Sequence, residues 1–491
     1  MASIMFVGTA SDVGKSVITA GMCRILRQDG YRPAPFKAQN MSLNSYVTPD
    51  GLEIGRAQAV QAEAAGIPCQ SDMNPVLLKP TGDTQAQLVL HGRPAGNQSA
   101  WDYFMGRDRE ALWEEVKGAY DRLALAYDPV VLEGAGSISE MNLWRRDIVN
   151  MRMALHARAD VYLIADIDRG GVFGSVYGTL ALLPPEEKAL IRGVLVNKFR
   201  GDGRLFEDGR RQLADLAGVP VVGVLPFYKD IHIEEEDSVA LGQRVVFPRP
   251  GAFNIAVLAL PHLSNFTDFS WIERMGSLHV YYTDDPAQLA GAQLIILPGS
   301  KNTIDDLLYI RSRGVDRVVV DAFRAGIPVV GICGGYQIMG LTIADPYGVE
   351  GAVRTVEGLG ILPVHTVLEK EKTTVRRRYA FGSADGPVCE GYEIHMGKTM
   401  AVGGERPLNY VGDGSDGYRI GPGCWGTYMH GILDNRAVVE ELLAAAGGSG
   451  LELRWFDYKG YKEEQYDRLA AHIRAHIDME WIYRNLQMQK R

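Results

Sequence analysis

The sequence predicts an α/β protein with two doubly wound domains, each built on a mostly parallel sheet, and a helical C-terminal tail. Short apolar runs of strand length alternate with segments of helical periodicity. Glycines and polar residues follow several of these runs directly, at the edge where parallel strands present their carboxyl ends to ligands. The alternation stops at an acidic, proline-containing stretch and begins again at residues 253–257.

The length of 491 residues is sufficient for two domains and an appendage. The acidic run at 234–237 and the two prolines around Arg249 have linker composition. In the tail, Leu469, Ile473, Ile477 and Trp481 recur every four residues, which predicts an apolar helical face packed on the protein. The predicted divisions are a first domain at 1–228, a linker at 229–251, a second domain at 252–440 and a helical tail at 441–491.

Composition narrows the class of protein. Hydrophobic residues make up 46% of the chain and charged residues 23%, which is ordinary for a globular protein. The formal net charge of −9 argues against a nucleic-acid partner, so an anionic substrate would need a local basic pocket. Five scattered cysteines without a CxxC pair argue against a zinc site or a disulfide framework. With no signal peptide and no membrane-length apolar run, we expect a cytoplasmic protein that does not contact a membrane.

The first strand, residues 3–7, leads into a glycine loop, GTASDVGKS, and then a helix. This order predicts a phosphate-binding loop for ATP, bounded by Gly8 and Gly14. Lys15 would reach the β and γ oxygens, and Ser16 would bind Mg²⁺. A glycine turn with an incidental lysine is the alternative. Because five residues rather than four separate the glycines, the loop resembles that of dethiobiotin synthetase and its relatives.

Polar residues at later strand ends extend this site. Glu133 ends the run PVVLE, where a carboxylate beside the phosphate loop can serve as the second Mg²⁺ ligand. In the dethiobiotin synthetase-like fold, a lysine matching Lys37 lies beside the phosphates and the substrate carboxylate, so Lys37 is a candidate substrate-binding residue, although a surface lysine is the plainer interpretation. An asparagine in the place of Asn197 contacts the nucleotide base in related P-loop folds.

The segment NLWRRDIVNM, residues 142–151, contains Arg145, Arg146 and Asp147. We interpret the two arginines as candidate partners of substrate carboxylates, with Asp147 beside them. A solvated start of a helix fits the same residues equally well.

The second domain centres on residues 327–340, IPVVGICGGYQIMG. An apolar strand, Cys333, two glycines and a helix predict a nucleophile elbow with a thiol in place of serine. The positive end of the helix dipole favours the thiolate, and the Gly334 N–H can face a developing oxyanion. A buried structural cysteine is the alternative.

His430, in GTYMHG, is the candidate base for Cys333. GICGGYQ followed by YMHG resembles the class I, triad-type glutamine amidotransferases, and LIILPGS resembles their oxyanion loop, which would contain Gly299. Ile432 stands where that family has a triad glutamate, an absence typical of its cobyrinate and cobyrate branch. Glu393 or His395, in GYEIHMG, is a candidate substitute that orients His430.

Both halves together resemble the cobyric acid synthase family, on motifs such as NMSLNS, EGAGS and GYEIHMG that occur in order. The resemblance implies a flavodoxin-like glutaminase domain, with L-glutamine as nitrogen donor. It also implies ATP-dependent amidation, through acyl phosphates, of the b, d, e and g carboxylates of adenosylcobyrinic acid a,c-diamide, a corrinoid, to give adenosylcobyric acid. Ammonia released at Cys333 would cross the protein interior. The alternatives are a cobyrinic acid a,c-diamide synthase and a non-catalytic P-loop nucleotide switch with a decayed glutaminase module.

Overall fold

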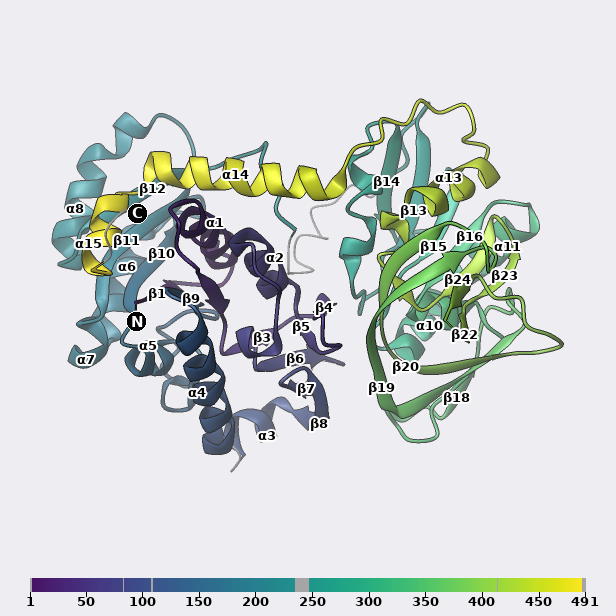
Figure 1. The fold of residues 1–491 in the computed structure, drawn as a ribbon, viewed down its shortest axis with the longest axis horizontal. Coiled ribbons are helices and arrows are strands. Elements are labelled where there is room, and N and C mark those ends of the chain that lie inside the picture. Colours follow the sequence, from purple (N-terminus) through teal and green to yellow (C-terminus); the bar gives the residue numbers. More distant parts are fainter. Residues whose placement is uncertain (1, 83, 107–108, 235–246, 413, 488–491) are drawn as a thin grey trace.

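The protein forms two lobes joined along one side (Figure 1). The computed structural model describes residues 2–487 except 83, 107–108, 235–246 and 413. Most of the acidic part of the expected linker therefore lies outside the described residues. The α/β class with mostly parallel sheets and C-terminal helices is confirmed.

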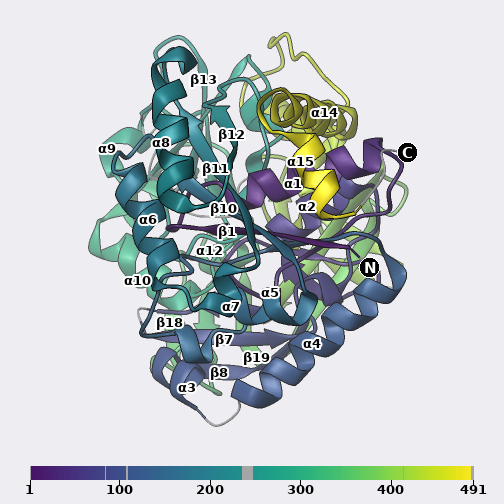
Figure 2. The ribbon, with the colours of Figure 1, turned by 90° about the vertical axis from the view of Figure 1, so that its left-hand side faces the viewer.

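The first domain is built on a six-stranded parallel sheet in the order β12-β11-β10-β1-β9-β2. Side chains of β1 alternate between the two faces, as the period of two requires: Ile4 and Phe6 face one core, Met5 and Val7 the other. Figure 2 shows α6 and α8 on one face of this sheet and α1, α14 and α15 on the other. Strand order reverses beside β1, so the carboxyl end of β1 is the switch point at which α/β sheets bind ligands. The strand bounds are β1 Ser3–Gly8, β2 Ala34–Phe36, β9 Val130–Glu133, β10 Asp160–Asp166, β11 Ile191–Phe199 and β12 Val221–Pro226.

Between β2 and β9 the chain adds a four-stranded sheet and a short hairpin, formed by β4 and β5, that faces the second domain (Figure 1). The strands are β3 Gln39–Met41, β4 Ser45–Val47, β5 Glu53–Gly55, β6 Val76–Pro80, β7 Gln85–Leu90 and β8 Arg93–Ser99. Helices of the first domain are α1 Lys15–Gln28, α2 Arg56–Ala65, α3 Ala100–Met105, α4 Arg109–Ala126, α5 Met151–Ala157, α6 Val172–Leu182, α7 Pro185–Lys188 and α8 Glu207–Ala217.

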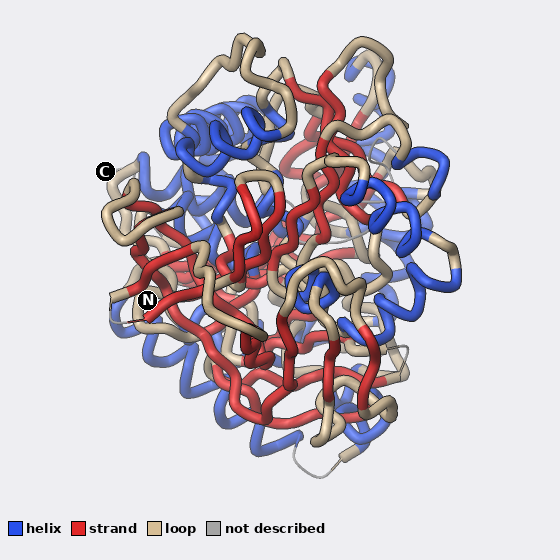
Figure 3. Tube along the Cα trace, turned by 90° about the vertical axis from the view of Figure 1, so that its right-hand side faces the viewer, coloured by secondary structure: helices blue, strands red, loops and turns tan. Residues whose placement is uncertain are grey.

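The second domain contains two sheets, whose strands are visible together in Figure 3. The first has the order β14-β13-β15-β16-β24-β23 and is parallel except at β23. Its strands are β13 Phe253–Leu258, β14 Leu278–Thr283, β15 Leu294–Leu297, β16 Val329–Ile332, β23 Tyr418–Gly421 and β24 Cys424–Thr427. Its helices are α9 Pro286–Leu289, α10 Thr303–Ser312, α11 Val315–Arg324, α12 Gly334–Met339 and α13 Arg436–Ala445.

The second sheet of this domain is largely a long antiparallel hairpin, which the sequence analysis did not predict. It pairs Tyr392 of β20 with His430 of β25, so it brings a strand from the middle of the domain onto the candidate base. The strands are β17 Thr342–Ala344, β18 Thr355–Glu357, β19 Val364–Phe381, β20 Val388–Ala401, β21 Asn409–Val411, β22 Gly414–Asp416 and β25 Met429–His430.

The tail returns from the second domain to the first (Figure 1). Helix α14, Tyr458–His476, places Leu469 and Ile473 on α1, where a Cβ on Gly21 would lie 2.2 Å from the Ile473 side chain. After α14, Ile477 bridges Gly223 of β12, and α15, Met479–Asn485, completes this core. The four-residue apolar spacing of the tail therefore marks the face that covers the first domain. No helix in the described ranges is long and apolar enough to span a bilayer.

Candidate active sites

The phosphate loop connects β1 to α1 in a conformation that needs its glycines. Gly14 has φ 100°, and a Cβ there would lie 2.2 Å from the Asn197 amide nitrogen. Lys15 Nζ folds over the loop and donates to the carbonyls of Ala10 at 3.1 Å and Gly136 at 2.9 Å. The lysine thus lies over the loop, where the cation of a phosphate-binding loop is expected.

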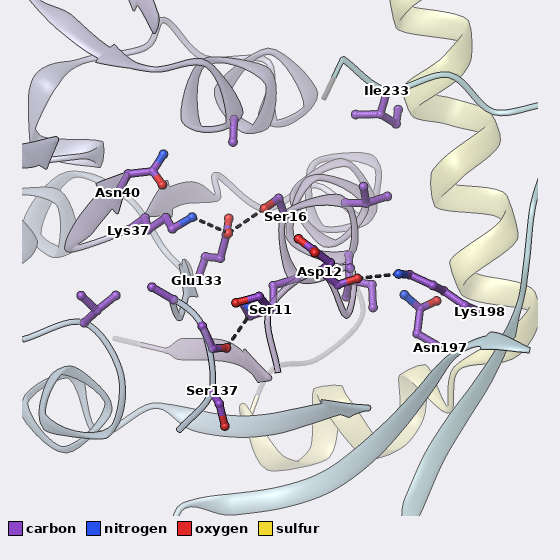
Figure 4. Close-up of a pocket in the computed structure, with 18 of the residues that line it drawn as sticks. Ser11, Asp12, Ser16, Lys37, Asn40, Glu133, Ser137, Asn197, Lys198 and Ile233 are labelled. Carbon is purple, nitrogen blue, oxygen red and sulfur yellow. Dashed lines mark hydrogen bonds and ion pairs between the residues drawn. The ribbon is translucent and has the colours of Figure 1, made fainter. Parts of the chain in front are cut away.

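Glu133 ends β9 at the floor of this site and is almost fully buried. Its carboxylate accepts hydrogen bonds from Ser16 Oγ at 2.7 Å and Lys37 Nζ at 2.9 Å (Figure 4). It also accepts one from Gln61 Nε2 at 2.6 Å. Burial alone would raise the pKa of Glu133, but the Lys37 ammonium and these hydrogen bonds outweigh burial and hold the pKa below its usual value. Glu133 is therefore an anion, and Lys37 is a buried partner of that anion rather than a surface lysine.

Ser16 and Glu133 offer the donor chemistry that Mg²⁺ prefers. Their hydroxyl and carboxylate oxygens meet within hydrogen-bond distance beside the phosphate loop. Mg²⁺ bound with nucleotide phosphates keeps several waters and needs only one or two protein oxygens. Within the described ranges, no group of three or more His, Cys, Asp or Glu side chains is placed to hold a metal by itself. The residues present fit an ion shared with a nucleotide.

A cavity of about 980 Å³ opens over the phosphate loop. Asn197 lines it and donates to the carbonyl of Val13 at 2.8 Å, so its amide supports the loop (Figure 4). Contact of Asn197 with a nucleotide base stays a prediction.

The arginine pair predicted for the substrate is exposed, and neither residue is among the described residues that line this cavity. Arg146 instead donates to the carbonyl of Phe104 at 2.9 Å. Asp147 does line the cavity and caps the backbone N–H of Val149 at 2.8 Å, and burial raises its pKa. Arg109 is a buried cation on the cavity wall that was not predicted. A lone arginine on an amphipathic helix does not indicate a binding site in the sequence.

Cys333 stands between β16 and α12 with φ 52° and ψ −106°. Such a conformation costs a residue with a side chain about 1–3 kcal/mol and occurs where the surroundings enforce it. The surroundings here are tight, since a Cβ on Gly335 would lie 1.9 Å from the Leu297 carbonyl oxygen. A Cβ on Gly334 would lie 2.7 Å from the Ser300 amide nitrogen. The strand, the strained residue and the short helix together form the predicted elbow.

Gly299 and Gly334 both lie beside this elbow. A Cβ on Gly299 would lie 3.2 Å from His430 Cε1 and 3.0 Å from Ser264 Oγ. A side chain at position 299 would therefore crowd His430, and one at position 334 would crowd the Ser300 backbone. The oxyanion role of the two glycines stays a prediction.

His430 is buried, and its Nδ1 lies 2.7 Å from Asp268 Oδ2. The other oxygen of Asp268 accepts the Gly431 N–H at 2.8 Å, so both oxygens of the carboxylate are engaged beside the imidazole. Burial would lower the pKa of His430, but the Asp268 charge and hydrogen bond, together with Cys333, raise it to about 10. An imidazolium of this kind stabilises a neighbouring thiolate.

Asp268, and neither Glu393 nor His395, is therefore the group that holds His430. Glu393 Oε2 pairs with His395 Nε2 at 3.0 Å, and its other oxygen accepts from Arg377 Nε at 2.9 Å. His395 stacks on Tyr428 with ring centroids 3.7 Å apart. Glu393 and His395, the two predicted candidates, therefore pair with each other. The carboxylate beside His430 is that of Asp268, from a loop for which no role was predicted.

The two domains meet at a polar interface beside His430. Asn265, next to the Asp268 turn, donates to the Ser45 carbonyl of the first domain at 3.0 Å and to the Tyr392 hydroxyl at 3.0 Å. The Tyr392 ring in turn stacks on His430. The segment that holds the base is thus bound to the β4–β5 hairpin of the other domain.

A smaller cavity lies at the same interface and includes Cys333 in its lining. Lys79 of the first domain and Lys372 of the second both line it. Behind them Glu53, which is fully buried, accepts from Lys79 at 2.7 Å and from Lys372, so a buried ion triad joins the two domains beside the Cys333 cavity.

A cysteine on an elbow beside a His–Asp pair, next to a domain with a phosphate loop, is the arrangement of a glutamine amidotransferase domain joined to a nucleotide-binding domain. The comparisons agree with this class. The family described as CobQ/CobB/MinD/ParA nucleotide binding domain matches residues 4–239, and the CobB/CobQ-like glutamine amidotransferase domain matches residues 254–438.

Curated relatives define the family more narrowly. Cobyric acid synthase of Bacteroides fragilis is 57% identical over 486 residues, covering 98% of each chain. The cobyric acid synthases of Phocaeicola vulgatus and Citrobacter koseri are 57% and 48% identical, covering 98% and 99% of this chain and 97% and 99% of their own. The chain belongs to the cobyric acid synthase family, the glutamine-hydrolysing ligases of cobalamin biosynthesis, and it is an enzyme rather than a nucleotide switch.

Proposed function

We propose that this enzyme amidates the b, d, e and g carboxylates of adenosylcobyrinic acid a,c-diamide, with ATP and glutamine, to give adenosylcobyric acid. One observation carries the proposal: the Cys333–His430–Asp268 site is built directly against the domain that contains the phosphate loop. The near-complete coverage of cobyric acid synthases supports this acceptor over that of the a,c-diamide synthase.

At the phosphate loop, a substrate carboxylate oxygen would attack the γ-phosphorus of ATP. A P–O bond breaks, ADP leaves, and an acyl phosphate remains on the substrate. Lys15 and the loop amides would stabilise the charge that gathers on the transferring phosphoryl group. Ser16 and Glu133 would hold Mg²⁺, which neutralises phosphate charge when bound.

At Cys333, the thiolate would attack the side-chain carbonyl of glutamine. The His430 imidazolium, held by Asp268, would protonate the departing nitrogen, so ammonia and a glutamyl thioester form. Water, deprotonated by the then neutral His430, would hydrolyse the thioester to glutamate and restore the thiolate.

Ammonia would then attack the acyl phosphate carbon, and phosphate would leave as the amide forms. In water near neutral pH most ammonia becomes ammonium, which is not a nucleophile, so an enclosed passage between the sites preserves it. The route would begin in the Cys333 cavity and pass Lys79, a residue of the first domain that lines it.

The test is to incubate the protein with ATP, glutamine and candidate corrinoids and to count new amides by mass spectrometry. Four amides on the a,c-diamide support the proposal. Amidation of unsubstituted cobyrinic acid at two positions would favour the a,c-diamide synthase. ATP hydrolysis without any amide on any corrinoid would contradict both activities.

A further inference from the structure

Lys301 carries a positive charge that lacks a partner. It follows the Gly299–Ser300 loop and lines the Cys333 cavity. Within the part of the chain that the structure describes, no acceptor lies within hydrogen-bond or ion-pair distance of its ammonium group. An enclosed cation without an acceptor is costly, so its position indicates that an anion binds there.

Other cations of the same cavity differ in this respect. Lys79 and Lys372 also line it, but Glu53 pairs with both of them and is itself fully buried. Each of these ammonium groups therefore has a carboxylate oxygen as its acceptor, although one carboxylate balances only one of the two charges. Burial lowers the pKa of Lys372 to about 7, so the second charge is weakly held. Lys301 differs from both lysines in having no acceptor among the described residues.

Glu350 supplies an opposite charge in the same cavity. It accepts the Ile304 N–H at 3.1 Å and is too far from Lys301 to form an ion pair. Burial and the neighbouring Lys79 lower the pKa of Lys301 to about 8, and burial raises the pKa of Glu350 to about 7. The charged form of each group is therefore less stable than it would be in water. A ligand that places an anion beside Lys301 and a cation beside Glu350 would stabilise both charges.

Glutamine has the complementary shape and charge. Its reacting amide is separated by two methylene groups from a carbon that carries both a carboxylate and an ammonium. When the amide carbon of glutamine lies at Cys333, its carboxylate and ammonium lie at the other end of the ligand. The part of the cavity around that end must then offer one cation and one anion.

We propose that Lys301 binds the α-carboxylate of glutamine and that Glu350 binds its α-ammonium, so that this pair selects free glutamine over other amides. The inference rests on the glutaminase activity proposed above and assigns the amino-acid end of its substrate. Selectivity follows because an amide without either charge would leave a buried charge uncompensated.

The test combines three variants with three substrates in the presence of ATP and corrinoid, and it measures the carboxylic acid formed when each side-chain amide is hydrolysed. Glutamine is compared with 4-aminobutanamide, which lacks the carboxylate, and with glutaramate, which lacks the amine. Lys301→Met should lower kcat/KM for glutamine by about 10- to 100-fold, mainly through KM, and change that for 4-aminobutanamide less than about threefold. Glu350→Gln should show the same selectivity toward glutaramate, and Lys301→Arg should restore part of the glutamine activity.

Equal losses on glutamine and 4-aminobutanamide in Lys301→Met would overturn the assignment, because Lys301 would then act on Cys333 or on the fold. Ammonia-supported corrinoid amidation by each variant is the control for folding. If the truncated amides turn over too slowly, calorimetric titration of glutamine into Cys333→Ala, with and without Lys301→Met, replaces them. Unchanged affinity there would also overturn the assignment, whereas failure of the unmodified protein to release ammonia from glutamine would instead contradict the proposed function.

Discussion

Asp268 and His430 lie 162 residues apart in the sequence, yet Oδ2 of the aspartate is 2.7 Å from Nδ1 of the histidine. The contact supplies the acid that Ile432 cannot. A carboxylate at Nδ1 fixes the tautomer, so that Nε2 is the nitrogen left for the thiol and for substrate.

Asp268→Asn should reduce glutamine-supported amidation on the order of 10²- to 10⁴-fold, because the amide neither fixes the tautomer nor stabilises the imidazolium. Amidation supported by ammonium chloride should change little. Product formation with each nitrogen source, measured on the same preparation, gives the comparison. Equal loss with both sources would show that Asp268 serves the fold and not the base.

The same ion pair predicts a pH dependence of stability. The pKa of His430 is raised from an ordinary value near 6.5 to about 10, so the folded state keeps its proton more firmly than the unfolded state. The stabilisation is complete below about pH 6.5, declines as pH rises and is lost above about pH 10. Melting temperatures of the unmodified protein and of Asp268→Asn should therefore converge as pH rises from 6 to 9.5. A constant difference over that range would contradict a charged pair.

Installing at position 432 the glutamate that other triad-type glutamine amidotransferases have should not raise the glutaminase rate. Ile432 is fully buried in the core of the second domain, and Asp268 already occupies the place beside the imidazole. Ile432→Glu would bury a second carboxylate without a partner, so it should lower both the melting temperature and the glutaminase rate. Ile432→Val, a smaller change at the same site, is the matched control. A faster glutaminase in the glutamate variant would show that Asp268 leaves the base poorly oriented.

The elbow could be predicted because its determinants are local: an apolar strand, Cys333, two glycines and a helix are consecutive. The phosphate loop and Glu133 were predicted for the same reason, each from a strand and the residues that end it. Asp268 follows no strand end and lies in an aromatic turn, so only the fold connects it to His430. Lys301 and Glu350 are likewise joined by tertiary structure alone.

The long β19–β20 hairpin was missed for a different reason. The middle of β19, KEKTTVRRR, is rich in charged residues, a composition that does not indicate a strand. The hairpin nevertheless positions Tyr392 against His430 and Lys372 against Glu53. The interface between the sites therefore could not be derived from strand patterns.

Asn265→Ala should weaken the coupling of the two domains. Its amide holds the Asp268 turn to the Ser45 carbonyl of the first domain and to Tyr392. Loss of these two hydrogen bonds should lower the glutamine-supported rate by about 5- to 30-fold and leave the ammonia-supported rate nearly unchanged. Asn97→Ala removes an exposed amide contact across the same interface, to the Val349 carbonyl, and should have no comparable effect. Equal effects of the two variants would mean that the Asn265 contact has no special connection to His430.

The last prediction separates the two sites by their chemistry. Lys15→Ala should abolish amide formation with either nitrogen source, because the acyl phosphate must form before any amine can react. Cys333→Ala should abolish only the glutamine-supported reaction, since the thiolate takes part in none of the phosphoryl chemistry. With ammonium chloride, the Cys333→Ala variant should work better as pH rises and the fraction of free ammonia increases. Mass spectrometry of the corrinoid with each nitrogen source measures all four combinations. Amide formation by Lys15→Ala from ammonia, or failure of well-folded Cys333→Ala with ammonia, would contradict the division of labour between the two sites.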